Sequence, residues 1–302
     1  MDTNRLASSI VRGDRAALAR GITLAEDYPA QASRLLVRLG PPGRAFVVGV
    51  TGPPGTGKSS LVDRLIEAYR EKGLKVGVIA VDPTSPITGG ALLGDRIRMT
   101  AHAVDRSVFI RSMASRGWSG GLSRATSQVI RLMEAAGFDL ILLETVGIGQ
   151  SDIEVVGVSH AVIVVLMPGL GDDIQVSKAG LMEVGDIYVI NKSDLEGADP
   201  MVVSLLSLFR GSPRSPPVLK VSALTGDGIG RLPEALESIR QKFLSAGEDL
   251  KLKSIRGMIV EEARGAAMAR LAVVSQAKAG RLARQVLAGK ITVESAAARL
   301  VR

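Results

Sequence analysis

The sequence contains no cysteine and only two histidines, His102 and His160. The absence of cysteine excludes disulfide frameworks and thiol nucleophiles, and two separated histidines leave no Cys/His zinc cluster. No apolar run approaches the roughly 20 residues that a membrane-spanning helix needs. The N-terminus, "MDTNRLASSIVRGDRAALAR", interleaves charge where a signal peptide would place its apolar stretch. We therefore expect a protein of the reducing cytoplasm, with no membrane partner.

The composition is that of an ordinary globular protein, but the charge is unevenly distributed. The 302 residues are 46% hydrophobic and 23% charged, with a formal net charge of +8. Residues 249–302 hold 11 Lys or Arg and 4 Asp or Glu, a net +7 (11 − 4). A basic tail could bind nucleic acid, but this one lacks aromatics and any dense Lys/Arg block. Its alanine-rich "EEARGAAMARLAVVSQAKAGRLARQVLAGK" favours an amphipathic helical arm, and we expect no nucleic-acid partner.

Apolar spacing predicts helices at both ends of the chain, with alternating strands and helices between them. Leu6, Ile10, Leu18 and Ile22 recur at helical spacing before "GPPG" at 40–43 interrupts the pattern. Short β-branched runs follow, namely "AFVVGV", "KVGVIAVD", "SVFI", "DLILLET", "AVIVVLM", "DIYVIN" and "VLKVSA". Helical patterns such as "SSLVDRLIEAYREKG" separate them, and continuously apolar strands indicate a parallel sheet covered on both faces. We predict an α/β fold with a mostly parallel central sheet flanked by helices, divided into an N-terminal helical segment (1–43), a central domain (44–247) and a C-terminal helical extension (248–302).

A glycine-rich stretch between the first strand and the following helix predicts a phosphate site. "GPPGTGKSS", at 52–60, matches G-x-x-x-x-G-K-[ST] in that setting, the mark of a P-loop NTPase. Glycines let backbone N–H groups approach phosphate oxygens, and the helix directs its positive N-terminal end at the same anion. Lys58 adds a charge for the β and γ phosphates, and the Ser59 hydroxyl is placed to ligate Mg²⁺. The predicted phosphate-binding residues are Gly52, Pro54, Gly55, Thr56, Gly57, Lys58, Ser59 and Ser60.

Acidic residues at predicted strand ends are candidate Mg²⁺ ligands. Asp82 ends "KVGVIAVD", Glu144 ends "DLILLET", and Asp95 lies in the glycine-flanked "GGALLGDRIRM". Such acids, taken singly, are more often solvated or capping groups, but strand-end acids on a parallel sheet face the ligand crevice. Together with Ser59, they form the predicted metal set.

Two loops after predicted strands are candidate switches. "ETVG", at 144–147, has the acid-x-x-Gly form whose glycine amide senses the γ phosphate in switch GTPases, here with glutamate in place of aspartate. Gly147 is thus a predicted nucleotide contact, and Gln150 could orient water, although its spacing after the glycine is unusual. We take Lys58, Glu144 and Gln150 as catalytic candidates. The polar "PGLGDDIQVSKAG", at 168–180, is either another switch or an ordinary surface loop.

A second motif indicates which base is bound. "NKSD", at 191–194, follows the apolar "DIYVI" and has the form N-K-x-D at the carboxyl end of a strand. Guanine offers its N1–H and exocyclic amine side by side, and one carboxylate can accept both, whereas adenine would leave Asp194 unpaired. "VSAL", at 221–224, would then supply the backbone N–H of Ala223 to the guanine carbonyl oxygen. The predicted base-binding residues are Asn191, Lys192, Asp194, Ser222, Ala223 and Leu224.

Five stretches of the sequence, taken together, resemble the MeaB/ArgK family of GTPases associated with methylmalonyl-CoA mutase. They are "VRGDRAALARGITLAED", "GPPGTGKSSLVDRL", "VDPTSPITGGALLGDRIRM", "FDLILLETVGIGQSDIEV" and "LMPGLGDDIQVSKAGLMEVGDIYVINKSD". The resemblance implies a homodimeric GTPase that uses GTP/GDP and Mg²⁺ and attends an adenosylcobalamin-dependent acyl-CoA mutase, gating cofactor delivery and protecting the enzyme. It also implies that Lys178 lies in an additional switch loop, and we add this lysine to the catalytic candidates. The tail after Leu250 is less similar than the core. Trp118 stands where a smaller residue is expected, and the simplest interpretation is a partly exposed packing tryptophan.

Other P-loop functions remain open at this stage. A small-molecule kinase would need a phosphoryl-acceptor pocket and lid arginines, and "NKSD" with "SAL" argues against it. A nickel-insertion GTPase chaperone has a similar architecture but carries its metal on Cys/His clusters, for which this chain is poorly equipped. Transport-coupled kinase activity finds no support, since there is neither a membrane span nor an aromatic amine-binding box.

Overall fold

A computed structural model describes residues 2–41, 43, 45–82, 102, 104–114, 125–145, 157–169, 183–211, 215–245, 252, 256, 259–260, 263 and 276–301. The chain divides into two compact units, Met1–Ile255 and Arg256–Arg302. The predicted boundaries at 43 and 247 stay predictions.

The first unit is built on a parallel sheet that has seven strands within the described ranges. They are β1 (Phe46–Thr51), β2 (Val76–Asp82), β3 (Val108–Ala114), β4 (Leu140–Glu144), β5 (Ala161–Leu166), β6 (Ile187–Ile190) and β7 (Val218–Lys220). Their order is β3-β2-β4-β1-β5-β6-β7, and every neighbouring pair is parallel. The predicted α/β class is therefore confirmed. The strand order changes direction at β1, which is where open parallel sheets bind ligands.

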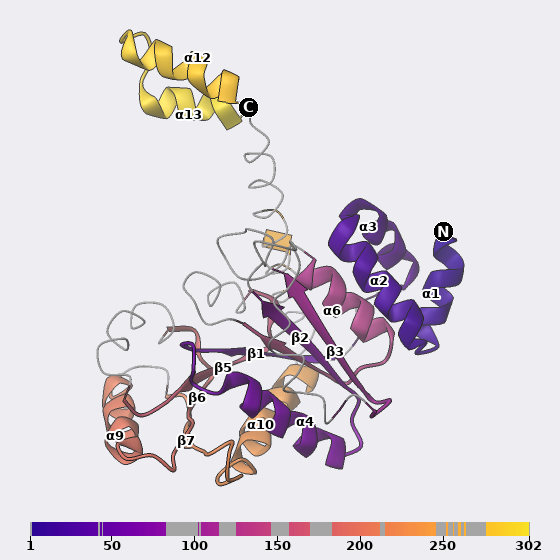
Figure 1. Cartoon of the computed structure of the whole chain (residues 1–302), viewed down its shortest axis with the longest axis vertical. Coiled ribbons are helices and arrows are strands. Elements are labelled where there is room, and N and C mark those ends of the chain that lie inside the picture. The colour runs from indigo at the N-terminus through magenta and orange to yellow at the C-terminus, as the bar shows by residue number, and fades with distance from the viewer. Residues whose placement is uncertain are drawn as a thin grey trace. The chain divides into compact units, whose positions relative to one another are not determined.

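Both faces of the sheet are covered, as the continuously apolar strands require. On one face, α4 (Lys58–Glu71) and α10 (Arg231–Ser245) bury side chains such as Leu65 and Leu236 against Val48 and Val78. On the other face lies α6 (Thr126–Ala135), so close that a Cβ on Gly77 would meet the Met133 sulfur at 2.9 Å. Figure 1 shows α4 and α10 together on one side of the sheet and α6 on the other. A further helix, α9 (Ala198–Leu208), packs beside β6 and β7.

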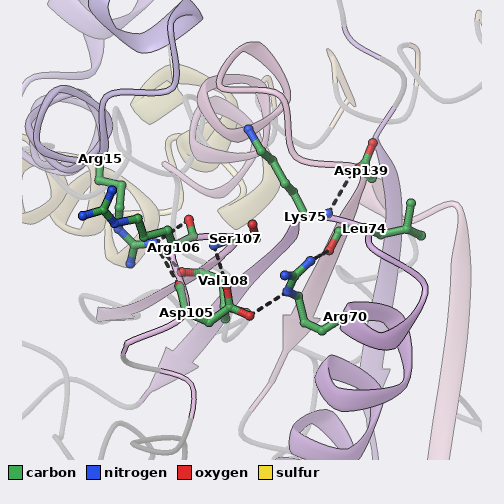
Figure 2. Close-up of polar contacts among 9 residues, drawn as sticks. All are labelled: Arg15, Arg70, Leu74, Lys75, Asp105, Arg106, Ser107, Val108 and Asp139. Carbon is green, nitrogen blue, oxygen red and sulfur yellow. Dashed lines mark hydrogen bonds and ion pairs between the residues drawn. The ribbon is translucent and has the colours of Figure 1, made fainter.

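The predicted N-terminal helices are present and pack beside α6. They are α1 (Thr3–Val11), α2 (Arg15–Asp27) and α3 (Pro29–Arg38), and the side chains of Asp2 and Asp14 cap the first two. Arg15 fastens α2 to the sheet by donating to the carbonyls of Asp105 at 3.3 Å, Arg106 at 3.0 Å and Val108 at 2.6 Å. Figure 2 shows Arg70, near the end of α4, meeting the same turn at the Asp105 carboxylate, 2.7 Å away. The N-terminal helices and the P-loop helix thus share one anchor.

The second unit contains a short helical hairpin, α12 (Gln276–Leu287) and α13 (Val293–Val301). The turn between them has Gly289 at a left-handed φ of 66°, which glycine adopts without strain. The Lys278 ammonium donates to the Leu300 carbonyl at 3.4 Å across the hairpin. Helices in the C-terminal extension are therefore confirmed. Among the described residues, no helix is both long and apolar enough to cross a membrane.

Candidate nucleotide-binding site

The phosphate loop connects β1 to α4, and two of its glycines are required both by their backbone angles and by lack of space for a side chain. Gly52 has φ 138°, and a Cβ there would lie 2.0 Å from the Val165 carbonyl oxygen. Gly57 has φ 85°, and its Cβ would lie 2.4 Å from Nδ2 of Asn191. Any other residue at these positions would collide with its surroundings as well as strain the backbone. The glycine spacing is therefore a requirement of this turn.

Lys58 begins α4 and turns its ammonium back over the loop. Its Nζ donates to the carbonyls of Gly52 at 2.8 Å and Pro53 at 3.0 Å, and the residue is only 7% exposed. Thr56 closes the turn by donating to the same Pro53 carbonyl at 2.9 Å. A buried cation beside the N-terminus of a helix is suited to a phosphate chain. Ser60, in the first turn of α4, is exposed, as are Pro54 and Gly55.

The sheet brings together two members of the predicted metal set. The Ser59 hydroxyl donates to Oε1 of Glu144 at 2.6 Å, and these residues are 8% and 3% exposed. Glu144 ends β4, between β1 and β2, and pairs with Val50 and Ala80 in the strand register. Asp82 is the last residue of β2, at the same edge of the sheet. A buried hydroxyl and carboxylate are the hard oxygen donors that Mg²⁺ prefers, so Ser59 and Glu144 fit this ion.

Asn191 joins the phosphate loop to the 222–224 loop, which follows β7. Its Nδ2 donates to the carbonyls of Thr56 at 2.8 Å and Gly57 at 3.4 Å, while its Oδ1 accepts the N–H of Ala223 at 3.0 Å. The side chain is 2% exposed. Sequence reasoning expected the Ala223 N–H to face guanine; in the structure that N–H is bonded to Asn191. The asparagine of N-K-x-D is thus a bridge between the two loops.

Asp194 lies against the same 222–224 loop. The Ser222 hydroxyl donates to Oδ1 of Asp194 at 2.6 Å, and this bond is the first cause that holds the pKa of the aspartate below its usual range. The carboxylate is therefore ionised at neutral pH and can accept two donors from a base. Lys192 has a left-handed φ of 55°, which is an unfavourable backbone conformation for lysine. Strained conformations of this kind cluster at binding sites. Leu224 is 81% exposed.

Four predicted site residues and one further residue are not among those that the structure describes. Asp95, Gly147, Gln150 and Lys178 lie outside the described residues, as does Trp118. The predicted site is therefore described at the phosphate loop, at Ser59 and Glu144, and at the two base-side loops.

Sequence reasoning missed Arg64. This side chain leaves α4 and donates through Nε to the Ala223 carbonyl at 3.0 Å and through Nη2 to the Leu224 carbonyl at 3.3 Å. Nη1 is paired with Glu67 at 3.0 Å. The G-x-x-x-x-G-K-[ST] motif ends at Ser59 and does not include this arginine. Its partners lie about 160 positions further along the chain, so no local pattern could have indicated the contact.

One further group of possible metal ligands combines two residues of α4 with His102. Ligand atoms of Asp63, Glu67 and His102 are within 4.8 Å of one another. Within the described residues, however, Glu67 is paired with Arg64, and His102 Nε2 lies 3.0 Å from Oδ1 of Asp63. These two pairs account for the arrangement, and we assign no metal to it.

The chain is similar to a known protein family and to several named proteins. Residues 18–279 match the model of a family described as methylmalonyl Co-A mutase-associated GTPase MeaB. A protein named as a GTPase from Pyrococcus horikoshii is 48% identical over 267 residues, covering 86% of this chain and 83% of that one. The GTPase ArgK of Escherichia coli is 40% identical, with 83% and 80% covered. The mouse protein named methylmalonic aciduria type A homolog, mitochondrial, is 36% identical, with 81% and 65% covered.

A solved structure is similar over nearly the whole length. It is described as a LAO/AO transport system kinase and superposes with a TM-score of 0.74 at 28% identity, covering 99% of this chain and 96% of that one. The similarity includes the parallel sheet and the helices that flank it.

Proposed function

The chain belongs to the MeaB family of methylmalonyl-CoA mutase-associated GTPases, and from this we propose that it is a Mg²⁺-dependent GTPase chaperone of an adenosylcobalamin-dependent acyl-CoA mutase. GTP binding and hydrolysis come with the family. The proposal adds that the nucleotide cycle gates delivery of the cobalamin cofactor to the mutase and protects the enzyme. The family name and the mouse relative's name support a mutase of the methylmalonyl-CoA type.

Hydrolysis transfers the γ-phosphoryl group of GTP to water and releases GDP and phosphate. In the proposed arrangement, the backbone N–H groups of the phosphate loop and the Lys58 ammonium stabilise negative charge on the phosphates. Ser59 and Glu144 would hold Mg²⁺, which would neutralise further phosphate charge. Gly147 would sense the γ phosphate, and Gln150 would orient the attacking water.

One observation carries the nucleotide part of the proposal. Asn191 is bonded both to the phosphate loop and to Ala223, so the two recognition elements predicted for phosphate and base are joined by one buried side chain. Asp194, ionised and supported by Ser222, would accept the N1–H and amine of guanine. Adenine lacks that pair of donors, and binding it would leave the carboxylate unpaired.

Further parts of the proposal concern partners and switching. We propose a homodimer in which residues 248–302 form a helical dimerisation arm, with the GTPase domain at 44–247 and the helical segment at 1–43. Lys178 would belong to a switch loop that couples the bound nucleotide to the mutase. The reducing cytoplasm is the proposed compartment.

A capture experiment tests the mutase role. The full-length protein, loaded with a non-hydrolysable GTP analogue, GDP or an ATP analogue, is used to capture partners from native lysate, which are identified by mass spectrometry. We expect a cobalamin-dependent mutase subunit only in the guanine-nucleotide states. If no mutase is recovered while the purified protein still hydrolyses GTP without an added acceptor, the chaperone role is wrong and the GTPase activity stands. Dependence of GTP consumption on an added acceptor would instead favour a kinase.

A further inference from the structure

The 222–224 loop is held to the phosphate-loop side of the protein by two separate contacts. On its N–H side, Ala223 donates to Asn191 at 3.0 Å. On its carbonyl side, Ala223 and Leu224 accept from Arg64 at 3.0 and 3.3 Å. The first contact comes from the N-K-x-D motif, whereas the second comes from α4, beyond the end of the G-x-x-x-x-G-K-[ST] motif at Ser59.

Arg64 lies on the helix that carries the phosphate-binding residues. It follows Lys58 by six positions, less than two helical turns, on the rigid element whose first turn faces the phosphates. Its guanidinium spans two successive carbonyls of the 222–224 loop. Displacement of this arginine would therefore change the spacing between the phosphate loop and the 222–224 loop without altering the residues of the phosphate loop.

The chemistry of the contact suits this role. A guanidinium is charged at every accessible pH and presents its donors in a planar fork, so one side chain can bond two carbonyls and a carboxylate together. Glu67, three residues further along α4, holds Nη1 at 3.0 Å and directs the other nitrogens toward the loop. The pair is partly solvated, with side-chain exposures of 36% and 42%, so its importance lies in geometry rather than in buried charge.

The proposed guanine contact at Asp194 depends on the same loop. Ser222, next to Ala223, donates to the Asp194 carboxylate at 2.6 Å. Movement of the loop would thus disturb both the Ala223 bond to Asn191 and the orientation of the Asp194 carboxylate, the proposed acceptor of the guanine donors. The phosphate contacts should change less, because Lys58 is held by Gly52 and Pro53 and the described bonds of Arg64 go to Glu67, Ala223 and Leu224.

We propose that Arg64 is a positioning residue that sets the 222–224 loop against the P-loop helix and thereby determines the guanine-over-adenine preference of the GTPase. The inference rests on the proposed assignment of Asp194 and the 222–224 loop to the base. Loss of a charge-assisted contact to two carbonyls should weaken GTP and GDP binding about tenfold. Affinity for an ATP analogue, which uses the phosphate loop alone, should change less than about twofold, and kcat at saturating GTP should be retained while KM rises.

The experiment compares four variants of the full-length protein with the parent. Arg64→Ala removes the contact, and Arg64→Lys keeps the charge but can reach only one carbonyl, so its effect should be intermediate. Glu67→Gln keeps Arg64 but weakens its support, and should raise the GTP Kd about twofold to threefold. The matched control is Arg240→Ala, because Arg240 also pairs with a glutamate three residues away on a helix, Glu237, but contacts neither loop in any bond described. Titration gives Kd for non-hydrolysable GTP and ATP analogues, and steady-state hydrolysis gives kcat and KM.

The ratio of the two affinities separates positioning from a general loss of structure. A partly unfolded variant loses binding sites for both nucleotides equally, whereas displacement of the loop lowers the GTP-to-ATP affinity ratio. An unchanged ratio in Arg64→Ala, or an equal drop in Arg240→Ala, would overturn the inference. If Arg64→Ala does not fold, Arg64→Lys and Glu67→Gln must still lower the ratio for the inference to stand.

A further variant separates this inference from the assignment beneath it. Asp194→Asn exchanges a carboxylate oxygen for an amide donor, so it should weaken GTP and favour xanthosine triphosphate, which has a carbonyl where guanine has its amine. If Asp194→Asn shifts the base preference and Arg64→Ala does not, the role of Arg64 is wrong and the base assignment stands. If neither variant shifts it, the base assignment itself fails.

Discussion

Removal of the Asn191 side chain should uncouple the phosphate loop from the 222–224 loop. In Asn191→Ala, the Thr56 carbonyl loses a donor at 2.8 Å and the Ala223 N–H loses an acceptor at 3.0 Å, while the 3.4 Å contact to Gly57 is too long to add much. Because Asn191 is only 2% exposed, water does not readily replace these partners.

The size of the effect follows from the two backbone groups that lose their partners. A buried polar group left without its hydrogen bond costs about 1–3 kcal/mol. Taking roughly 1–2 kcal/mol for each of the two groups, the variant should lose about 2–4 kcal/mol, which is a 30-fold to 900-fold weaker affinity if the whole cost appears in binding. Any part that appears in stability lowers the free energy of unfolding by the complementary amount.

The assay measures both quantities on the same protein. Fluorescence titration with a labelled guanine nucleotide gives Kd, and urea unfolding without nucleotide gives the free energy of unfolding. Asn191→Asp keeps the acceptor for the Ala223 N–H but places an oxygen opposite the Thr56 carbonyl. Its effect therefore measures the loss of the hydrogen bond to the phosphate loop alone. The control is Asn4→Ala, at the chain's only other asparagine, which accepts from Arg38 on the protein surface. If the losses of binding free energy and of unfolding free energy in Asn191→Ala together came to less than about 1 kcal/mol, Asn191 would not hold the two loops together as argued.

Three further predictions concern the loop glycine, the metal side and pH. Gly52→Ala should lower the free energy of unfolding by roughly 2–5 kcal/mol, because it strains the backbone and places a Cβ 2.0 Å from a carbonyl oxygen. Gly55→Ala is the control: its Cβ would have no atom within 4 Å, so it should lower the free energy of unfolding by only about 1 kcal/mol. Urea unfolding measures both, and equal losses in the two variants would contradict the predicted collision at Gly52. Glu144→Gln should raise the Mg²⁺ concentration for half-maximal GTP hydrolysis about 10-fold to 100-fold, and an unchanged Mg²⁺ requirement would remove Glu144 from the metal set. Burial lowers the pKa of His160 to about 4 from 6.5, so the unfolded chain binds a proton on this histidine at a higher pH than the folded protein does. The contribution of His160 to the free energy of unfolding should therefore be fully present above pH 6.5, and about 3 kcal/mol of it should be lost as the pH falls from 6.5 through 4. The test compares urea unfolding between pH 7.5 and 4 with that of His160→Asn, and identical pH slopes in the two proteins would contradict the shift.

The sequence predicted those features that depend on neighbouring residues. The glycine spacing of 52–57 could be read because each glycine answers a local demand of the backbone, as the positive φ angles of Gly52, Gly55 and Gly57 show. The parallel sheet could be predicted because strands buried on both faces are continuously apolar. The motif at 191–194 could be recognised because its three side chains lie within one turn after a strand.

Other features were decided by contacts between distant parts of the chain. The order β3-β2-β4-β1-β5-β6-β7 places β4 beside β1, and only this order brings Glu144 to Ser59, 85 positions away. The same holds for Asn191, whose partners Thr56 and Ala223 come from loops on both sides of it in sequence.

The sequence by itself therefore determined the class of fold and the glycine-rich turn after β1, because each is encoded in a short run of residues. The assignment of Asp194 to guanine stays a prediction from the motif at 191–194. Only the tertiary structure decided how these parts are connected, because no periodicity or motif spans the 159 positions between Arg64 and Ala223. That contact exists because the sheet packs α4 beside the loop that follows β7, and packing of this kind depends on the whole chain at once.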